Sequence, residues 1–288
     1  MKSFVFATTI CFVVMAGSAT IVFAGAKTVG LQNEAAISID PACLWPIIGG
    51  TMNPDAPPMP TSVPTAGCAP AGATITKDEN GWVRLADEGA DGARLHTGLR
   101  IAQRMKQRML ALHVYDSGGG SGVFSSLITG NFDASQHRLT NIQSFGFGDR
   151  CNGGLAKTHL TENGRLRVTA NMTPWDILMS PLGDMSFDDQ WSLGAERYGA
   201  AFTEAPGCAS CCSAVTREYE VDGAEMREIG LRYVASSGHR PTENTLGICL
   251  EEAVRDAAGA DNLVTGSERD VLNSAIAACV SSANSNGN

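Results

Sequence analysis

The stretch from Gly207 to Val234, GCASCCSAVTREYEVDGAEMREIGLRYV, carries the pattern that decides the fold. Asp222 and Gly223 separate two runs rich in β-branched and aromatic residues, and an Asp-Gly pair in that position is typical of a tight hairpin turn. In the first run, alternate positions share one face, and these are Val215, Arg217, Tyr219 and Val221. Strands joined by turns rather than by helices favour an antiparallel sheet.

The same signals recur upstream, from Thr74 onward. Asn80-Gly81 and Glu162-Asn163-Gly164 each stand between short alternating runs and predict two more hairpins. Between them lie further strand-like runs, namely LALHVYD, GVFSSLIT, RLTNIQSFGF, LAKTHLT and RLRVTAN. The predicted fold class is therefore α+β: an antiparallel β-sheet core of hairpins with a C-terminal helical hairpin, stabilised by disulfides.

Helical patterns interrupt or follow these strands. Apolar residues at three- and four-residue spacing predict an amphipathic helix from Leu95 to Met109. TPWDILMSP has Thr173 as N-cap, Pro174 in the first helical position and Asp176 as the capping-box acid. Two amphipathic helices near the C-terminus should pack antiparallel with Cys249 and Cys279 facing inward, which makes Cys249–Cys279 the favoured disulfide.

Composition divides the chain into five parts. Residues 1–24 have a basic start, an apolar stretch and a Val22-Phe23-Ala24 cleavage site, and are interpreted as a secretory signal peptide. Residues 25–72 are expected to form a proline-rich irregular N-terminal arm. Residues 73–240 should form a mainly antiparallel β domain, residues 241–280 the helical hairpin packed on it, and residues 281–288 a disordered tail.

Eight cysteines follow the signal, and an even number in an exported chain predicts up to four disulfides. They are Cys43, Cys68, Cys151, Cys208, Cys211, Cys212, Cys249 and Cys279. Cys43 and Cys68 flank the proline-rich stretch and either close it into a loop or pair elsewhere. One member of the Cys208–Cys212 cluster is expected to bond Cys151, which would tie two hairpin regions together.

The cluster CASCC resembles the papain-family signature C-G-[SA]-C-[WY], and CNGGL from Cys151 resembles a second stretch of that family. The resemblance implies a cysteine protease with Cys211 as nucleophile. However, the two motifs stand in the wrong order, the only later histidine, His239, comes too soon, and a strand rather than a helix follows Cys212.

Two other chemistries compete for the cysteine cluster. Cys208 and Cys211 form a C-x-x-C pair, which in redox proteins usually precedes a helix. A zinc site needs four ligands, and no second C-x-x-C or H-x-x-x-H completes the set. We therefore expect structural disulfides here and no metal.

Two stretches carry candidate ligand-binding residues. FGFGDRCNGG places Asp149, Arg150 and Asn152 on a glycine-rich turn after a strand, where they either bind a ligand or satisfy the turn itself. Trp175 and Asp176, or the acidic-aromatic segment SFDDQW (186–191), are suited to a carbohydrate or peptide surface. Asp188 and Asp189 would point to opposite faces of an extended strand, which argues against an acid–base pair.

The chain has a formal net charge of −9 and no basic cluster in its sequence, so we expect neither nucleic-acid binding nor attachment to anionic membranes. No apolar segment after the signal is long enough to span a bilayer. The leading hypothesis is a periplasmic or extracellular binding protein for a protein or glycan of the cell envelope, without a cofactor. The competing hypotheses are a secreted hydrolase and a purely structural envelope protein.

Overall fold

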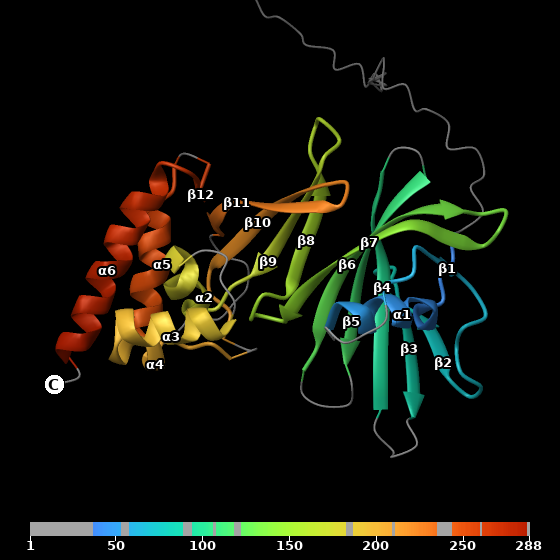
Figure 1. Ribbon diagram of the computed structural model, residues 1–288, viewed down its shortest axis with the longest axis horizontal. Helices are drawn as coiled ribbons and strands as arrows, with labels where there is room; N and C mark the ends of the chain where they lie inside the picture. Colours follow the sequence, from blue (N-terminus) through green and yellow to red (C-terminus); the bar gives the residue numbers. More distant parts are fainter. Residues whose placement is uncertain are drawn as a thin grey trace, which may run out of the picture. The chain divides into compact units, whose positions relative to one another are not determined.

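Two antiparallel sheets form the core of the computed structural model, which describes residues 37–52, 58–88, 94–105, 108–117, 122–182, 187–208, 211–234, 244–259 and 261–286 (Figure 1). The first sheet is curled and has seven strands in the order β1-β7-β6-β5-β4-β3-β2. Its strands are β1 (Ser62–Pro64), β2 (Thr74–Lys77), β3 (Val83–Glu88), β4 (Arg94–Arg104), β5 (Met109–Ser117), β6 (Phe124–Asp133) and β7 (Arg138–Asp149).

The second sheet has five strands in the order β12-β11-β10-β9-β8. They are β8 (Leu155–Leu160), β9 (Leu166–Asn171), β10 (Val215–Asp222), β11 (Glu225–Tyr233) and β12 (Leu263–Val264). Strand pairing is antiparallel throughout both sheets. The predicted fold class, an antiparallel core with C-terminal helices and disulfides, is therefore confirmed.

The three hairpin turns read from the sequence are present. Asp222 pairs with Glu225 across a two-residue turn, and Gly223 there adopts a φ of 60°, which a residue with a side chain rarely takes. Asn80-Gly81 joins β2 to β3, and the 161–165 turn joins β8 to β9. These turns were predictable because the residues that permit them are local in sequence.

The helix predicted from Leu95 to Met109 is wrong, because this segment forms most of β4 and the start of β5. Leu99 fits a period of two as well as a helical period, and it pairs with Val114 in the sheet. A register shift between Ile101 and Gln103 and a positive φ of 63° at Arg108 break the alternation near the connection. Pairing with the neighbouring strands β3 and β5 decided between the two periodicities.

Part of the N-terminal arm, expected to be irregular over residues 25–72, is structured and buried. A 3-10 turn η1 (Pro41–Leu44) leads into α1 (Trp45–Met52), and Leu44 and Ile47 are fully buried. Trp45 Nε1 donates to Thr97 Oγ1 on β4 over 2.9 Å. Strand β1 pairs with β7 at the sheet edge. The turn η1 and helix α1 thus pack against the first sheet, and β1 extends that sheet.

The helices that follow β9 gather on the second sheet. They are α2 (Pro174–Met179), the 3-10 turn η3 (Ser180–Leu182), α3 (Phe187–Tyr198), α4 (Ala200–Glu204), α5 (Thr245–Ala257) and α6 (Glu268–Asn286). Their apolar faces form one core with Val215, Leu231 and Val264 of the sheet.

Two predictions about helical segments are wrong. Helix α6 continues to Asn286, so residues 281–286, which were expected to be disordered, are part of the helix. Asp188 and Asp189, expected in an extended strand, instead belong to helix α3.

A smaller apolar cluster joins the two sheets. It contains Ala111 and Leu127 of the first sheet and Leu166 and Val168 of the second. The chain from Ser38 to Asn288 forms one compact unit. The residues of the predicted signal peptide, 1–24, lie outside the described residues, and the boundaries at 72 and 240 remain predictions.

On the opposite face of β5 from Leu112, His113 is buried among aromatic and basic neighbours. Its ring lies 5.0 Å from that of Trp82, and the Arg100 guanidinium stands over the same tryptophan at 4.9 Å. The His113 imidazole is 7% exposed, and its Nδ1 has no hydrogen-bond partner among the described residues. Burial lowers its pKa to about 4, with a further contribution from the charge of Arg100.

Acidification should therefore destabilise the protein through His113. The unfolded chain takes up this proton near pH 6.5, whereas the folded chain does so only near pH 4. The neutral imidazole contributes its full stabilisation above the His113 pKa of the unfolded chain. This stabilisation is lost as the pH falls to the His113 pKa of the folded chain. The loss amounts to about 3 kcal/mol. Urea unfolding at several pH values should show a shallower decline for His113→Gln, and equal slopes would contradict this role.

Candidate functional site

Four disulfides connect the eight cysteines: Cys43–Cys68, Cys151–Cys212, Cys208–Cys211 and Cys249–Cys279. The last joins α5 to α6, as the two inward-facing stripes led us to expect. Cys151 takes its partner from the cysteine cluster, and the remaining two cluster members bond each other. Cys211 therefore holds its Sγ in a disulfide and offers no thiolate for nucleophilic attack.

The same bonding argues against a metal at the cysteines. Asp40, Cys43 and Cys68 have their ligand atoms within 4.8 Å of one another. However, the two sulfurs are bonded to each other, and the Asp40 carboxylate accepts hydrogen bonds from the amides of Ala42, Cys68 and Ala69. Asp40 therefore caps backbone amides of the N-terminal segment, and the two cysteines cross-link it.

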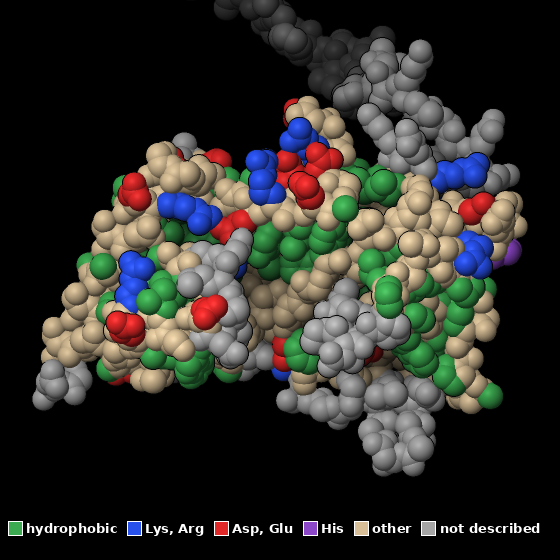
Figure 2. All heavy atoms as spheres, in the orientation of Figure 1, with side chains coloured by type: hydrophobic (Ala, Val, Ile, Leu, Met, Phe, Trp, Pro, Cys, Tyr) green, Lys and Arg blue, Asp and Glu red, His purple; other side chains and the backbone are tan. Residues whose placement is uncertain are grey.

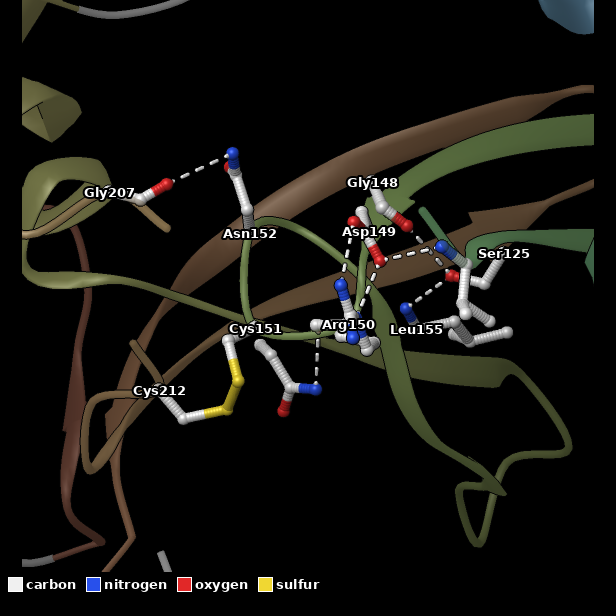
Figure 3. A network of polar contacts seen from close by, with 11 residues as sticks. Ser125, Gly148, Asp149, Arg150, Cys151, Asn152, Leu155, Gly207 and Cys212 are labelled. Atoms are coloured by element: carbon white, nitrogen blue, oxygen red, sulfur yellow. Dashed lines mark hydrogen bonds and ion pairs between the residues drawn. A yellow bond between two sulfur atoms is a disulfide. The ribbon is translucent and has the colours of Figure 1, made fainter. Parts of the chain in front are cut away.

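The turn from Gly148 to Gly154 uses its polar residues internally (Figure 3). Asp149 Oδ1 accepts hydrogen bonds from the Val123 amide and from Arg150 Nε, both at 2.9 Å. Asn152 Nδ2 donates to the carbonyl oxygen of Gly207 at 3.4 Å. Of the two interpretations of Asp149, Arg150 and Asn152, these contacts favour the one in which they satisfy the turn.

This turn is a junction between the two sheets. Ser125 Oγ on β6 donates to the Gly148 carbonyl oxygen at 3.2 Å and accepts from the Leu155 amide at 2.7 Å (Figure 3). The Cys151–Cys212 bond then attaches the turn to the segment that enters β10. Gly148 is required for close approach, because a Cβ there would lie 1.8 Å from the Asn152 carbonyl oxygen.

The other two candidate residues, Trp175 and Asp176, line a cavity of about 170 Å³. It lies between α2, η3, α3, β10, β11 and α6. Its lining residues are Trp175, Asp176, Met179, Ser180, Gln190, Arg217, Glu228 and Arg269. Gln190 comes from the SFDDQW segment, so the two alternative surfaces named from sequence meet in one place. The Trp175 and Trp191 ring centroids are 6.4 Å apart.

The N-terminus of α2 fixes the position of Asp176. Its Oδ2 accepts from the Thr173 amide at 2.7 Å and from Thr173 Oγ1 at 2.8 Å, and the Asp176 amide donates to Thr173 Oγ1 at 3.1 Å, which completes the predicted capping box. Burial raises the pKa of the Asp176 carboxyl above its usual value, while the Thr173 hydrogen bonds and the charge of Arg217 oppose that shift. The backbone amide of Trp175 donates to Pro206 at 3.1 Å, beside the cysteine cluster.

Opposite Asp176, two arginines share one carboxylate. Arg217 Nε lies 3.5 Å from Glu228 Oε2, and Arg269 forms an ion pair with Glu228 Oε1. The Arg217 Nε is buried and has no hydrogen-bond partner within the described residues. The cavity therefore contains two guanidinium groups, two carboxyl groups and an indole.

Sequence reasoning missed Arg217, Glu228 and Arg269 as site residues. The one local signal was the alternation of Val215, Arg217 and Tyr219, which places an arginine on the core-facing side of a strand. Such a residue needs a partner or a cavity. Its partner Glu228 lies across the hairpin, and Arg269 lies on another element altogether.

A second group of charges covers the other face of the second sheet, where blue and red spheres alternate around β10 and β11 (Figure 2). Arg165 and Arg227 both pair with Glu220, at 2.7 and 3.4 Å. Arg167 and Arg232 both pair with Glu218. The fold thus brings together four arginines that are not clustered in the sequence, and each of them pairs with Glu218 or Glu220 on β10.

The junction turn yields a prediction about stability. Gly148→Ala should lower the free energy of unfolding by about 3 kcal/mol, because the new methyl group overlaps backbone atoms of Asn152. Gly266→Ala is the matched control, since a Cβ at Gly266 meets nothing within 4 Å, and it should change stability by less than about 0.5 kcal/mol. Urea denaturation measures both, and equal losses would contradict tight packing at the turn.

Comparison with known proteins adds no family to these observations. No protein-family model, curated protein or solved structure matches the chain. Within the described ranges, no helix combines the length and hydropathy needed to cross a bilayer. Proposals about function therefore rest on the residues and contacts of this chain.

Proposed function

We propose that this chain is an exported binding protein and that its ligand occupies the cavity around Trp175 and Arg217. One observation carries the proposal: two segments named from sequence as carbohydrate or peptide surfaces meet there with Arg217, Glu228 and Arg269. Small-ligand sites combine apolar side chains with convergent polar groups, and here Trp175 and Met179 stand beside six polar or charged residues. The partner is a glycan or a protein group of the cell envelope.

Export is supported by two independent features. The first 24 residues have the layout of a secretory signal. Eight cysteines form four disulfides, a pattern that persists in oxidising compartments such as the periplasm or the extracellular space. Both features favour a secreted or periplasmic location.

The chemistry of the cavity favours a saccharide over a peptide group. Sugar hydroxyls both donate and accept hydrogen bonds, and the cavity offers arginine donors beside the acceptors Asp176 and Glu228. The Trp175 indole provides an apolar surface for the face of a sugar ring. A volume of about 170 Å³ is below the ~300 Å³ of the smallest drug-sized pockets and suits a single ring.

A hydrolase is the second candidate, because Asp176 and Glu228 line the same cavity. Burial raises the pKa of Asp176, as in carboxyl groups that act as general acids. Glu228 forms ion pairs with both Arg217 and Arg269. We rank binding first because the Asp176 Oδ2 atom is already engaged by Thr173 as a helix cap.

Titration with defined saccharides tests the proposal. Glucose, N-acetylglucosamine and glucuronic acid are added to the oxidised protein, followed by tryptophan fluorescence and saturation-transfer NMR. Arg269→Ala should weaken saccharide binding about tenfold or more, because it removes a charged donor from the cavity. Arg255→Ala is the matched control, since this exposed arginine pairs with Glu252 and Asp256 on α5, and it should change affinity less than about twofold.

Each alternative result has a defined meaning. Equal effects of the two arginine variants would place the ligand elsewhere and overturn the site. Binding of short peptides without any saccharide would overturn the glycan assignment while leaving a protein-binding role. Release of free sugar from oligosaccharides in the same samples would favour the hydrolase.

A further inference from the structure

The four disulfides differ in how much chain they close. The cysteines of Cys208–Cys211 are 3 residues apart, whereas the other three pairs are separated by 25, 30 and 61 residues. The stabilisation that a disulfide provides by restricting the unfolded chain increases with the length of the closed loop. Cys208–Cys211 is therefore the bond that the fold needs least.

The structure holds both ends of this short loop by other means. On one side, Gly207 accepts a hydrogen bond from Asn152 Nδ2 at 3.4 Å, and the preceding Pro206 accepts from the Trp175 amide at 3.1 Å. On the other side, Cys212 is bonded to Cys151, and the Ser213 amide donates to the Met172 carbonyl oxygen at 2.9 Å. None of these contacts involves the sulfur atom of Cys208 or Cys211.

Because the flanking segments are fixed, the two thiols would stay close after reduction. The Cα atoms of Cys208 and Cys211 are 5.1 Å apart, and the Cys211 amide donates to the Cys208 carbonyl oxygen at 2.8 Å. Proximity of this kind allows the two thiols to form the bond again when an oxidant is present. Reversible opening and closing is the property that distinguishes a redox pair from a permanent cross-link.

Access also sets this pair apart. Cys208 is exposed, whereas each of the other three disulfides includes a buried cysteine: Cys43 at 2%, Cys151 at 8% and Cys279 at 4% exposure. An attacking thiolate must reach a disulfide sulfur directly, so exposure controls which bond reacts first.

We propose that Cys208–Cys211 is a reversible dithiol–disulfide site that accepts two electrons from a dithiol, such as the C-x-x-C pair of a thiol oxidoreductase. One thiolate of the dithiol attacks the Cys208 sulfur, the Cys208–Cys211 bond breaks, and the Cys211 thiolate leaves and takes up a proton. The second thiolate of the dithiol then attacks its own partner sulfur in the mixed disulfide. Cys208 is released as a thiol, and the dithiol becomes a disulfide.

Graded reduction of the native oxidised protein tests this site. Samples equilibrated in mixtures of reduced and oxidised dithiothreitol are trapped with N-ethylmaleimide and mapped by peptide mass spectrometry. Cys208 and Cys211 should become labelled together at a reduced-to-oxidised ratio at least about tenfold lower than any other pair requires. Circular dichroism should stay unchanged, and transfer to oxidised dithiothreitol should restore the bond. Labelling of this pair only together with the others, or unfolding upon its reduction, would overturn the proposal.

Paired serine variants separate a redox site from a structural cross-link. Cys208→Ser with Cys211→Ser should keep the melting temperature within about 3 °C of the parent, while Cys249→Ser with Cys279→Ser should lower it by about 10 °C or more. A large loss from the first pair of changes would make Cys208–Cys211 a structural bond and refute exchange without unfolding. Saccharide titration is independent of this result, so the two proposals can fail separately.

Discussion

The meeting of three backbone segments at Cys151 is the constraint on which the rest of the structure depends. The chain leaves the first sheet after Asp149, reverses within a few residues and begins the second sheet at Leu155. The Gly148 amide donates to the Gly153 carbonyl oxygen at 2.9 Å, and the Gly153 amide donates to Asn171 on β9 at 3.1 Å. With Cys212 bonded to Cys151, the entry to β10 is fixed at the same point, and so is the position of the cavity behind it.

Much of the fold was predictable wherever a local interaction decides it. Gly223 has to be a turn because only a residue without a side chain takes its backbone angles readily, and Thr173 with Asp176 caps its own helix. The strand β4 was not predictable, because the position of Leu99 fits both a helical and a strand periodicity. Only its pairing with Val114 in the sheet shows that it belongs to a strand. The N-terminal segment was missed for the same reason: its proline-rich composition conceals residues that are buried by distant strands.

The candidate site shows the same division. Trp175 and Asp176 could be named from one short motif, but the cavity exists only where β10, β11 and α6 bring Arg217, Glu228 and Arg269 beside them. Arg217 and Arg269 are far apart in sequence, so no spacing rule connects them. Polar residues on a conspicuous glycine-rich turn, in contrast, proved to be engaged with one another, because a tight junction needs its own hydrogen bonds.

Adjacent cysteines that belong to different disulfides impose a demand on biogenesis. Cys211 and Cys212 present two chemically equivalent sulfurs to Cys151, one residue apart. A bond to the wrong one would shift the entry of β10 by one position, and a one-residue slip exchanges the two faces of a strand. Glu218 and Glu220 would then compete with Tyr219 and Val221 for the apolar side. The register of β10 thus depends on which of two neighbouring sulfur atoms bonds Cys151.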